Sequence, residues 1–505
     1  MSNKIISLSK LAQIIDQLKK DQKSIVHCHG VFDLVHPGHL KHFEDAKKLG
    51  DILIVTISPD HYVNKGPGRP VFNERLRLEH LAALQMIDYV AVNDTPSAVE
   101  TILHLKPNVY VKGKEYENLE DLTGNVAQEK DAIGSVGGKI AFIGDAIYSS
   151  TQLLNSYFSV LSPQSENYLK DLRKRYSAID VILQLEKLKD VSVAVIGEVI
   201  IDEYYFCRPL GLANKSVTVN SQYLRSESHL GGAGGVANHI AGFCDNVHFI
   251  SQLGAENDNK NFIQQKLRPN ISCKFFTKSK SPTIVKRRYL DNVYNRLFEL
   301  SFFDDRTLDG EEEIEIVTYL KMVLDQFDIV LVADYGHGFI STPTLIDTIC
   351  SAKSYLAINT QTNSANKGFN LATKYDRANY FCLDRVELQF AMQSQHQPTE
   401  QSIIQLSQKI SADMIAITEG SEGSTTWKKD GGFYKALALT SETVDATGAG
   451  DAYFSMTSIC AGSGFDPDLI GLIGNCAGAM IVRVLGNQEP IQPAHLCKFI
   501  TTLLK

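Results

Sequence analysis

The sequence predicts an α/β protein of two domains. Its 505 residues exceed what a single hydrophobic core usually supports. From residue 24 to about residue 155, short apolar runs alternate with segments of helical spacing, a pattern typical of parallel strands joined by helices. A second series of the same kind begins at VSVAVIG, from residue 191, and continues to the C-terminal end. No repeat relates the two halves.

The individual elements follow from the apolar runs. Strands are expected at SIVHCH (24–29) and DILIVTIS (51–58), and then at DYVAV, NVYVK and KIAFI. Helical spacing marks the segments between them, such as HLKHFEDAKKLG and NERLRLEHLAALQ. The predicted boundaries are an N-terminal helix at 1–21, a first α/β domain at 22–159, a charged helical connector at 160–188 and a second α/β domain at 189–505.

Composition and charge exclude several classes of function. Hydrophobic residues make up 44% and charged residues 21%, which is ordinary for a globular protein, and the net charge of −8 disfavours nucleic acid as a partner. The nine cysteines are scattered without a CxxC pair, which indicates reduced, mostly buried thiols in a cytoplasmic protein. The most membrane-like stretch, Leu469–Val482, has only fourteen residues, so no membrane partner is expected.

Four histidines lie within HGVFDLVHPGHLKH, residues 29–42. Pro37 suits the first turn of a helix, so His36 and His39 are expected at the helix N-terminus, where free N–H groups and the helix dipole attract anions. Two imidazoles there add donors to phosphate oxygens, especially while charge develops during phosphoryl or nucleotidyl transfer. The pattern therefore favours a phosphate site.

Two other interpretations of these histidines stay open at this point. A zinc site would need a third ligand, for which His27, His29 and His42 are candidates. A purely structural role is the second alternative.

The pattern GxFDxxHxGH after a predicted strand, here Gly30 to His39, resembles the signature of the cytidylyltransferase-like nucleotidyltransferases. The resemblance continues through NKGPGRPVFNERLR (64–77), VYVKGKEY (109–116) and YSST (148–151), and it is nearest to the heptose-phosphate adenylyltransferase branch. It implies a Rossmann-like domain with a site for the phosphates of a nucleoside triphosphate.

Residue roles follow from this resemblance. His36 and His39 would stabilise the α-phosphate while a substrate phosphate attacks it and pyrophosphate leaves. Further contacts to the phosphates are implied for Lys65, Arg77, Lys112, Ser150 and Thr151. A solvated surface position is the alternative for Lys65 and Arg77.

A second motif, VDATGAGDAYFS, occupies residues 444–455. Gly448, Ala449 and Gly450 are expected to present backbone N–H groups at the start of a helix and to form an anion hole for a transferring phosphoryl group. Asp451 stands at the same helix start, placed to take a proton from a substrate hydroxyl. A glycine-rich turn without catalytic function is the alternative.

Together with HLGGAGGVANHIAGF (229–243) and GEVIIDEYYF (197–206), this motif resembles the ribokinase-like (PfkB-type) carbohydrate kinases, nearest to the heptose-7-phosphate kinase branch. The segment 282–305 is similar to the small β lid of that family. The resemblance implies sugar binding by Asp202, Gly231, Gly232 and Asn238. It also implies nucleotide binding by Thr418, Gly420, Gly423 and Asn475, and magnesium association for Asp384 and Glu387. For Asn475, a buried helix is the alternative.

Three segments depart from the kinase pattern. The acidic Asn-x-x-Glu motif is Asp384-Arg-Val-Glu387, the strand that often ends in Asp-Pro-Lys reads AINTQT (357–362), and the early Gly-Asp pair is Gly197-Glu198. Asp451 and its anion hole are retained. The departures therefore concern metal handling and the level of kinase activity.

The two halves together resemble the bifunctional enzymes of ADP-heptose synthesis, with the domains in reversed order. This implies ATP-dependent phosphorylation of a sugar phosphate, heptose 7-phosphate at the anomeric hydroxyl. Nucleotidyl transfer then gives an NDP-sugar, a precursor of bacterial surface glycans, and pyrophosphate. The implied cofactors are Mg²⁺, ATP as phosphoryl donor and ATP or CTP as nucleotidyl donor, and a homodimer is expected. The alternatives are CTP-dependent activation of another sugar or polyol phosphate, or one active domain with the other as a regulatory binding module.

Overall fold

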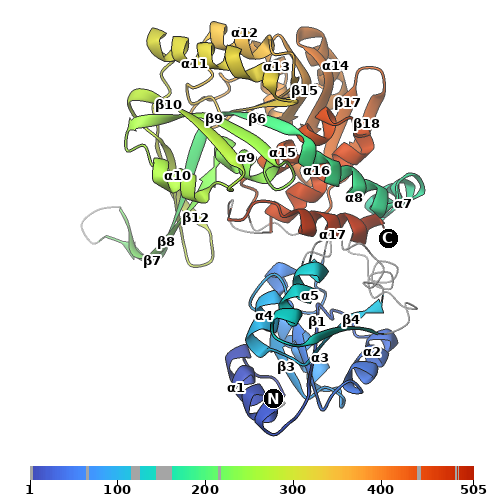
Figure 1. Cartoon of the computed structure of the whole chain (residues 1–505). Helices are drawn as coiled ribbons and strands as arrows, with labels where there is room; N and C mark the ends of the chain where they lie inside the picture. Colours follow the sequence, from blue (N-terminus) through green and yellow to red (C-terminus); the bar gives the residue numbers. More distant parts are fainter. Residues whose placement is uncertain are drawn as a thin grey trace. The chain divides into compact units, whose positions relative to one another are not determined.

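The computed structural model describes residues 4–63, 68–114, 125–143, 162–213, 218–440, 445–483, 486 and 488–504. The chain divides into two compact units, Met1–Ile182 with Pro493–Lys505, and Leu183–Gln492 (Figure 1). Both units are built from sheets with helices packed on them, which confirms the predicted α/β class. The finer boundaries expected after residues 21, 159 and 188 stay predictions.

The first unit contains a parallel sheet in the order β3-β2-β1-β4-β5. The order reverses between β1 and β4, and ligands of such sheets bind at the carboxyl ends of the strands beside this point. The strands are β1 (Ile25–Gly30), β2 (Ile52–Ile57), β3 (Tyr89–Val92), β4 (Val109–Gly113) and β5 (Lys139–Ile143).

Helices cover both faces of this sheet, which explains why its strands are apolar on both sides. Phe43 and Leu81, from α2 and α3, pack with Val26 and Val55 on one face. Helices α1, α4 and α5 cover the other face. The helices of this unit are α1 (Leu8–Lys20), α2 (Pro37–Lys47), α3 (Glu74–Ala82), α4 (Val99–Leu105), α5 (Asn125–Ser135), α7 (Pro163–Arg175) and α17 (Pro493–Leu504), and α8 (Ala178–Glu186) lies at its boundary with the second unit.

The second unit contains a sheet in the order β10-β9-β6-β13-β14-β15-β16-β17-β18. All neighbours are parallel except the pairs β16–β17 and β17–β18, which are antiparallel. The strands are β6 (Ser192–Gly197), β9 (Asn246–Glu256), β10 (Ile271–Pro282), β13 (Ile329–Asp334), β14 (Tyr355–Thr360), β15 (Arg377–Asp384), β16 (Ser411–Thr418), β17 (Ser424–Lys428) and β18 (Gly432–Ala436).

Helices α11 to α14 pack on one face of this sheet, and α9, α15 and α16 lie on the other side (Figure 1). Helix α15 is buried along almost its whole length, which fits its apolar composition on every side. The helices of this unit are α9 (Gly232–Ile240), α10 (Lys260–Lys266), α11 (Gly310–Val323), α12 (Pro343–Cys350), α13 (Arg385–Met392), α14 (Thr399–Lys409), α15 (Ala449–Gly462) and α16 (Pro467–Ile481).

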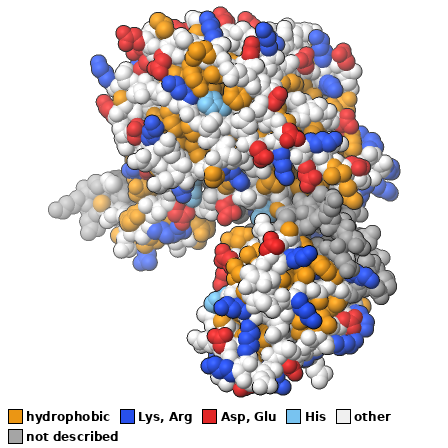
Figure 2. Space-filling model, viewed as in Figure 1, with side chains coloured by type: hydrophobic (Ala, Val, Ile, Leu, Met, Phe, Trp, Pro, Cys, Tyr) orange, Lys and Arg blue, Asp and Glu red, His pale blue; other side chains and the backbone are white. Residues whose placement is uncertain are grey.

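A separate four-stranded sheet, in the order β12-β11-β7-β8, forms the predicted lid. Its outer strand β12 carries exposed apolar side chains, among them Phe298, which is 54% exposed. Where Figure 1 places β7 and β8, Figure 2 shows hydrophobic side chains among charged ones. The lid strands are β7 (Val199–Leu212), β8 (Val219–Gly231), β11 (Ile284–Leu290) and β12 (Arg296–Phe302).

The nine cysteines all lie within the described ranges and form no disulfide; seven of them are buried. None of the described helices has the length and apolar character needed to cross a bilayer.

Candidate active sites

The histidine pair lies at the N-terminus of α2, in the loop that follows β1. His36 is the N-cap residue, and its Nδ1 accepts a hydrogen bond from the Gly38 N–H at 3.1 Å. The rings of His36 and His39 stack with their centroids 4.0 Å apart, and Phe32 packs edge-on against His39. Burial lowers the pKa of His36. The neutral ring therefore carries its proton on Nε2, which is free to donate to a ligand oxygen because Nδ1 already accepts.

The loop that presents these histidines is anchored by Asp33. Its carboxylate accepts hydrogen bonds from the N–H groups of Val71 and Phe72, both at 2.9 Å, and pairs with Arg69 at 3.5 Å. Asp33 and Arg69 are both buried. The aspartate of the motif is thus a positioning group that joins two loops at the carboxyl edge of the sheet.

Arg77 is completely buried, which corrects the prediction that it contacts phosphate. Its guanidinium donates to the carbonyl oxygens of Val31 at 2.7 Å, Ser58 at 2.8 Å and Phe72 at 3.0 Å. It also pairs with Asp60 at 2.6 Å. Its N–H groups are therefore used to hold together the loops after β1 and β2, and the alternative of a solvated surface position is wrong as well.

Lys112 lies near the end of β4, and its ammonium pairs with Glu129 of α5 at 2.7 Å. Both side chains are largely buried, with 14% and 3% of their surface exposed. Its contact with a phosphate stays a prediction. Lys65, Ser150 and Thr151 lie outside the described residues.

The zinc alternative depended on His27, His29 and His42. His27 Nε2 and His29 Nδ1 lie 2.8 Å and 2.9 Å from Thr56 Oγ1. Burial lowers the pKa of His27 to about 3 and that of His29 well below its ordinary value. Within the described ranges, no three His, Cys, Asp or Glu side chains are grouped to hold a metal ion. His27 and His29 are polar parts of the sheet's interior.

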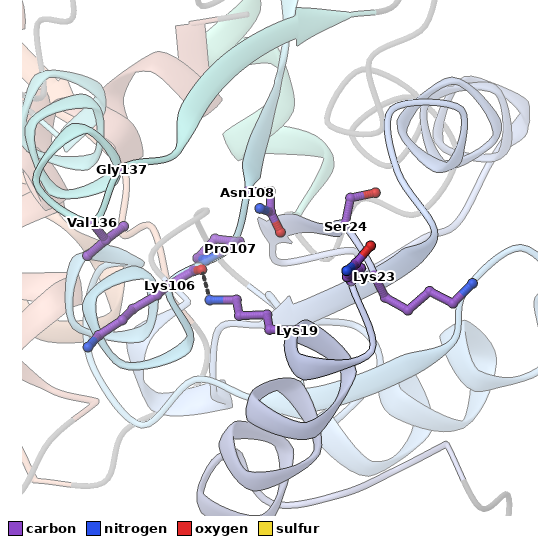
Figure 3. A pocket seen from close by; sticks show the side chains of 9 residues that line it. Lys19, Lys23, Ser24, Lys106, Pro107, Asn108, Val136 and Gly137 are labelled. Atoms are coloured by element: carbon purple, nitrogen blue, oxygen red, sulfur yellow. Dashed lines mark hydrogen bonds between the residues drawn. The ribbon is translucent and has the colours of Figure 1, made fainter.

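A cavity of about 370 Å³ lies at the opposite, amino-terminal edge of this sheet (Figure 3). Lys19 donates to the carbonyl oxygen of Lys106 across it, and the side chains of Lys106 and Lys23 extend in different directions. Because these positive charges do not converge, the cavity is not assigned a ligand.

In the second unit, Asp451 lies in the first turn of α15, directly after the glycines of the motif. Its Oδ1 accepts hydrogen bonds from Tyr335 Oη and Gln361 Nε2, both at 3.0 Å, whereas Oδ2 accepts none from the described residues. Burial raises the pKa of Asp451 to about 6, against the lowering effect of Tyr335. The carboxylate is thus ionised at neutral pH, a stronger base than an exposed aspartate, and has one oxygen available for a substrate hydroxyl.

Sequence reasoning did not find Tyr335 and Gln361. Tyr335 follows β13 and Gln361 follows β14, two adjacent strands of the parallel sheet. Gln361 belongs to the AINTQT segment, one of the departures from the kinase pattern. The available signal was their place directly after buried strands, where parallel sheets bring ligand-binding residues together.

Glu198, another of the departures, holds the loop that carries Tyr335. Its buried carboxylate accepts hydrogen bonds from the N–H groups of Tyr335 and His337, each at 3.0 Å, and of Phe339 at 3.4 Å. Burial, and then Asp334, raises the pKa of Glu198 to about 7. Glu198 therefore positions the loop whose Tyr335 side chain donates to Asp451.

The predicted anion hole begins at Gly448, whose φ of +83° lies in the left-handed region that favours glycine. The loop before it is organised by Asp445, which accepts hydrogen bonds from Thr447 N at 3.0 Å and Gly486 N at 3.2 Å. Arg296, the first residue of the lid strand β12, donates to Asp445 at 2.8 Å and to Thr447 Oγ1. The lid is thus linked to the loop that leads into the anion hole.

Asp202 lies in β7, is buried, and pairs with Arg288 of the neighbouring lid strand at 2.5 Å. A Cβ atom at Gly231 would lie 2.0 Å from Asp202 Oδ2, so only glycine leaves room for this carboxylate. Gly232, with φ of +58°, begins α9. Sugar contacts by these three residues stay predictions.

Two of the predicted site asparagines brace the backbone. The Asn238 amide donates to Lys266 O and accepts from Arg268 N, both at 2.9 Å, and its contact with the sugar stays a prediction. Asn475 Nδ2 donates to Ala436 O at 3.0 Å and to Leu437 O at 3.2 Å, and so joins α16 to the segment after β18. Its adenine contact stays a prediction.

The nucleotide-binding turn predicted at residues 418–423 follows β16. Thr418 ends the strand, and Gly420 and Gly423 have φ values of +59° and +102°. A Cβ atom at Gly423 would lie 2.1 Å from the carbonyl oxygen of Ala436, so the turn requires glycine there. Contact of this turn with a nucleotide stays a prediction.

Asp384 and Glu387 form a capping box at the start of α13. Asp384 Oδ1 accepts from Glu387 N at 2.7 Å, and Glu387 Oε2 accepts from Asp384 N at 2.6 Å. Burial raises the pKa of Glu387 to about 8, with Asp384 as the second cause. Mg²⁺ in phosphoryl-transfer sites commonly takes one or two carboxylates besides phosphate and water oxygens. Both oxygens of Glu387 already accept from backbone N–H groups, since Oε1 accepts from Thr362 N at 3.1 Å, so the association of this pair with magnesium stays a prediction.

Comparison with known proteins distinguishes the two units. Residues 27–155 match the family model of cytidylyltransferase-like proteins. In this part the chain is 34% identical over 154 residues to the bifunctional protein HldE of Desulfatibacillum aliphaticivorans, covering 30% of each chain. It is 41% identical over 128 residues to that of Helicobacter pylori strain P12, covering 25% of this chain and 27% of the relative. The chain thus covers less than a third of these relatives.

Two solved structures resemble the second unit. The ribokinase of Thermotoga maritima is 14% identical with a TM-score of 0.47, covering 60% of this chain and 98% of that one. Phosphofructokinase-2 of Escherichia coli is 10% identical with a TM-score of 0.49, covering 61% and 97%. Both scores are below 0.5, so the assignment rests on the family models.

The order of the two matched regions confirms the predicted arrangement, with the cytidylyltransferase-like part first. The second match extends over residues 190–494, more than half of the chain. By this match the chain belongs to the pfkB family of carbohydrate kinases.

Proposed function

We propose that the chain activates a phosphorylated heptose in two steps, first as a kinase and then as an adenylyltransferase. The observation that carries the proposal is the pairing of two phosphate-transfer sites in one chain. One unit has a buried base, Asp451, at a glycine-rich helix start, and the other has His36 and His39 at the start of α2. The relatives of the first unit are named bifunctional proteins, which supports a two-step reaction.

In the kinase step, Asp451 Oδ2 takes the proton of the anomeric hydroxyl. The hydroxyl oxygen then forms a bond to the γ-phosphorus of ATP while the bond to the bridging oxygen of ADP breaks. Tyr335 and Gln361 hold the other carboxylate oxygen in place. The N–H groups at the start of α15 receive the negative charge of the transferring group.

Mg²⁺ supplies neutralisation of the phosphate charges when it is bound with the nucleotide. Asp384 and Glu387 are the described carboxylates proposed to hold it, together with oxygens of the substrate.

In the second step, an oxygen of the sugar 1-phosphate attacks the α-phosphorus of ATP, and pyrophosphate leaves. The Nε2–H of His36 and a ring N–H of His39 donate to the oxygens of the α-phosphate, where charge increases. Their place at a helix N-terminus adds the attraction of the helix dipole.

A homodimer formed through the lid is part of the proposal. The outer lid strand exposes a row of apolar side chains, which a second copy of the sheet would cover. They are Leu297, Phe298, Leu300 and Phe302. We also propose a cytoplasmic location, where ATP is available.

The proposal is tested with the purified full chain and Mg²⁺. ADP formation is measured with heptose 7-phosphate, and pyrophosphate release is measured with ATP, CTP, GTP and UTP against heptose 1-phosphate and a panel of other sugar and polyol phosphates. ADP formation together with ATP-dependent pyrophosphate release from heptose 1-phosphate is the expected result. Pyrophosphate release only with CTP, or only with another sugar phosphate, would contradict the proposed nucleotide or sugar. ADP formation without pyrophosphate release would contradict the proposed activity of the first unit.

A further inference from the structure

Lys286 is a cation of the lid without a hydrogen-bond or ion-pair partner among the described residues. It lies in β11, in register with Asp202 of β7 and Ser301 of β12, and is half-buried. It forms no hydrogen bond or ion pair with any residue in the described ranges, and burial lowers its pKa. Because withdrawing an ammonium group from water is costly without a counter-charge, this position calls for an anion.

The neighbouring arginine on the same strand face shows the contrast. Arg288 pairs with Asp202 at 2.5 Å and with Glu299 at 2.9 Å, so its charge is more than balanced within the sheet. Lys278, a buried lysine of β10, donates to the carbonyl oxygens of Asp304 and Arg306. The donors of these two side chains are used by the protein, whereas those of Lys286 are available.

His337 lies in the loop that also carries Tyr335 and is a second donor without a hydrogen-bond partner among the described residues. Its side chain is 2% exposed, and neither ring nitrogen forms a hydrogen bond within the described part of the chain. Burial lowers the pKa of His337 to about 4, and Lys286 is the charge that lowers it most. A buried imidazole with no hydrogen bond costs stability, and such a group in a native structure points to a missing ligand.

These two groups lie beside the proposed base. Lys286 lowers the pKa of Asp451, and Asp451 raises the pKa of Lys286. The ammonium and the carboxylate are therefore within electrostatic range of each other. The lid strand and the loop after β13 therefore bring a cation and a neutral donor to the site where the sugar reacts.

We propose that Lys286 and His337 form an anion subsite beside Asp451 that binds a phosphate group of the kinase reactants. This rests on the proposed kinase function. Two phosphates have the required chemistry, the ester already present on the sugar and the phosphoryl group in transfer. A neutral sugar hydroxyl would leave the charge of Lys286 unbalanced, whereas a phosphate balances it and accepts from both donors.

The test uses the full chain with Lys286→Met, which keeps the length of the side chain and removes its charge. Lys321→Met, on the exposed face of α11, is the matched control. Lys286→Met is expected to reduce kcat/KM for ADP formation with heptose 7-phosphate by roughly 100-fold. Lys286→Arg should recover most of this loss, His337→Gln should reduce kcat/KM less, and Lys321→Met should leave it unchanged.

The choice of acceptor substrate shows which of the two phosphates the subsite binds. If the subsite binds the ester on the sugar, the loss is confined to heptose 7-phosphate and unphosphorylated heptose reacts as before. If it binds the group in transfer, kcat falls equally with both acceptors.

A binding measurement separates this inference from the proposed function. Inorganic phosphate should give broader ³¹P NMR lines in the presence of the unaltered chain than in the presence of the Lys286→Met variant. The site of His36 and His39 is the same in both proteins, so phosphate bound there does not contribute to the difference. This comparison needs no turnover, so it stands even if heptose phosphates are not substrates. Lys286→Met should also keep or raise the melting temperature, since it removes an unpaired charge. Two results would overturn the proposal. In the first, Lys286→Met binds phosphate as the unaltered chain does and has the same kcat/KM per folded protein. In the second, Lys286→Met binds phosphate as the unaltered chain does and has a lowered melting temperature.

Discussion

Tyr335 Oη lies 3.0 Å from Asp451 Oδ1 and donates a hydrogen bond to it, although the two residues are 116 positions apart. This bond favours the ionised carboxylate and counteracts part of the effect of burial on the pKa of Asp451. The tyrosine therefore helps to set the pH range in which Asp451 is ionised and available as the proposed base.

Replacing Tyr335 by Phe is expected to raise the pKa of Asp451 above its present value of about 6, because the ionised form loses a donor. Only the ionised base accepts a proton, so the acidic limb of the kcat profile for ADP formation should move to higher pH. Activity well above that limb should be retained. The control is Tyr319→Phe, which removes the hydroxyl that bonds to His248. An acidic limb unchanged by Tyr335→Phe would contradict this role.

Asp451→Asn should reduce ADP formation by about 10³-fold, since the amide cannot accept the proton, and should leave pyrophosphate release intact. The amide oxygen can still accept from Tyr335, so the fold should be preserved. Both activities are measured on the same preparation. Loss of both in a folded protein would contradict separate sites.

His39→Ala is expected to give the reverse result. It should reduce pyrophosphate release by about 10²-fold because a donor to the α-phosphate is lost. ADP formation should stay as in the unaltered chain. His80→Ala, on α3, is a control within the same unit. An equal loss of pyrophosphate release in His39→Ala and His80→Ala would indicate reduced stability and not a lost contact with the α-phosphate.

Arg77→Met should lower the free energy of unfolding of the first unit by about 3 kcal/mol, because three carbonyl oxygens and Asp60 lose their donor. Urea denaturation measures this change. Arg75→Met is the control on the same helix, since Arg75 is 73% exposed and should change the value by less than about 0.5 kcal/mol. If Arg77→Met were as stable as the unaltered chain but bound ATP more weakly, the result would support the phosphate contact that the structure contradicts.

Arg296→Gln is expected to lower kcat/KM for the kinase by roughly 10-fold, because the lid strand loses its link to the loop before the anion hole. The melting temperature should change little, since Arg296 is 49% exposed. Arg208→Gln, at an exposed position of the same lid sheet, is the control. An unchanged kcat/KM of Arg296→Gln would contradict a functional link between the lid and the anion hole.

The sequence predicted the features that depend on local order. The strands at 24–29 and 51–58, the histidine pair at a helix start and Asp451 after the glycines all depend on neighbours within a few residues. Tyr335 and Gln361 reach Asp451 only because β13 and β14 are adjacent, and strand order cannot be obtained from apolar periodicity.

The buried polar residues escaped prediction for a related reason. Arg77 stands in a helix rich in charge, where a surface position is the ordinary expectation. Its burial depends on carbonyl groups in the loops after β1 and β2, and the place of Asn238 depends in the same way on the backbone near residue 266. Such partners are fixed by tertiary structure, which single-residue patterns do not contain.

The fit between Gly231 and Asp202 has a practical consequence for protein engineering. With the carboxylate 2.0 Å from where a Cβ atom would stand, every side chain at position 231 would displace it. In a mutant library aimed at a new sugar preference, a substitution at this position would disturb the pair between Asp202 and Arg288. Substitutions are better placed at other positions of the lid sheet, with Gly231 left constant.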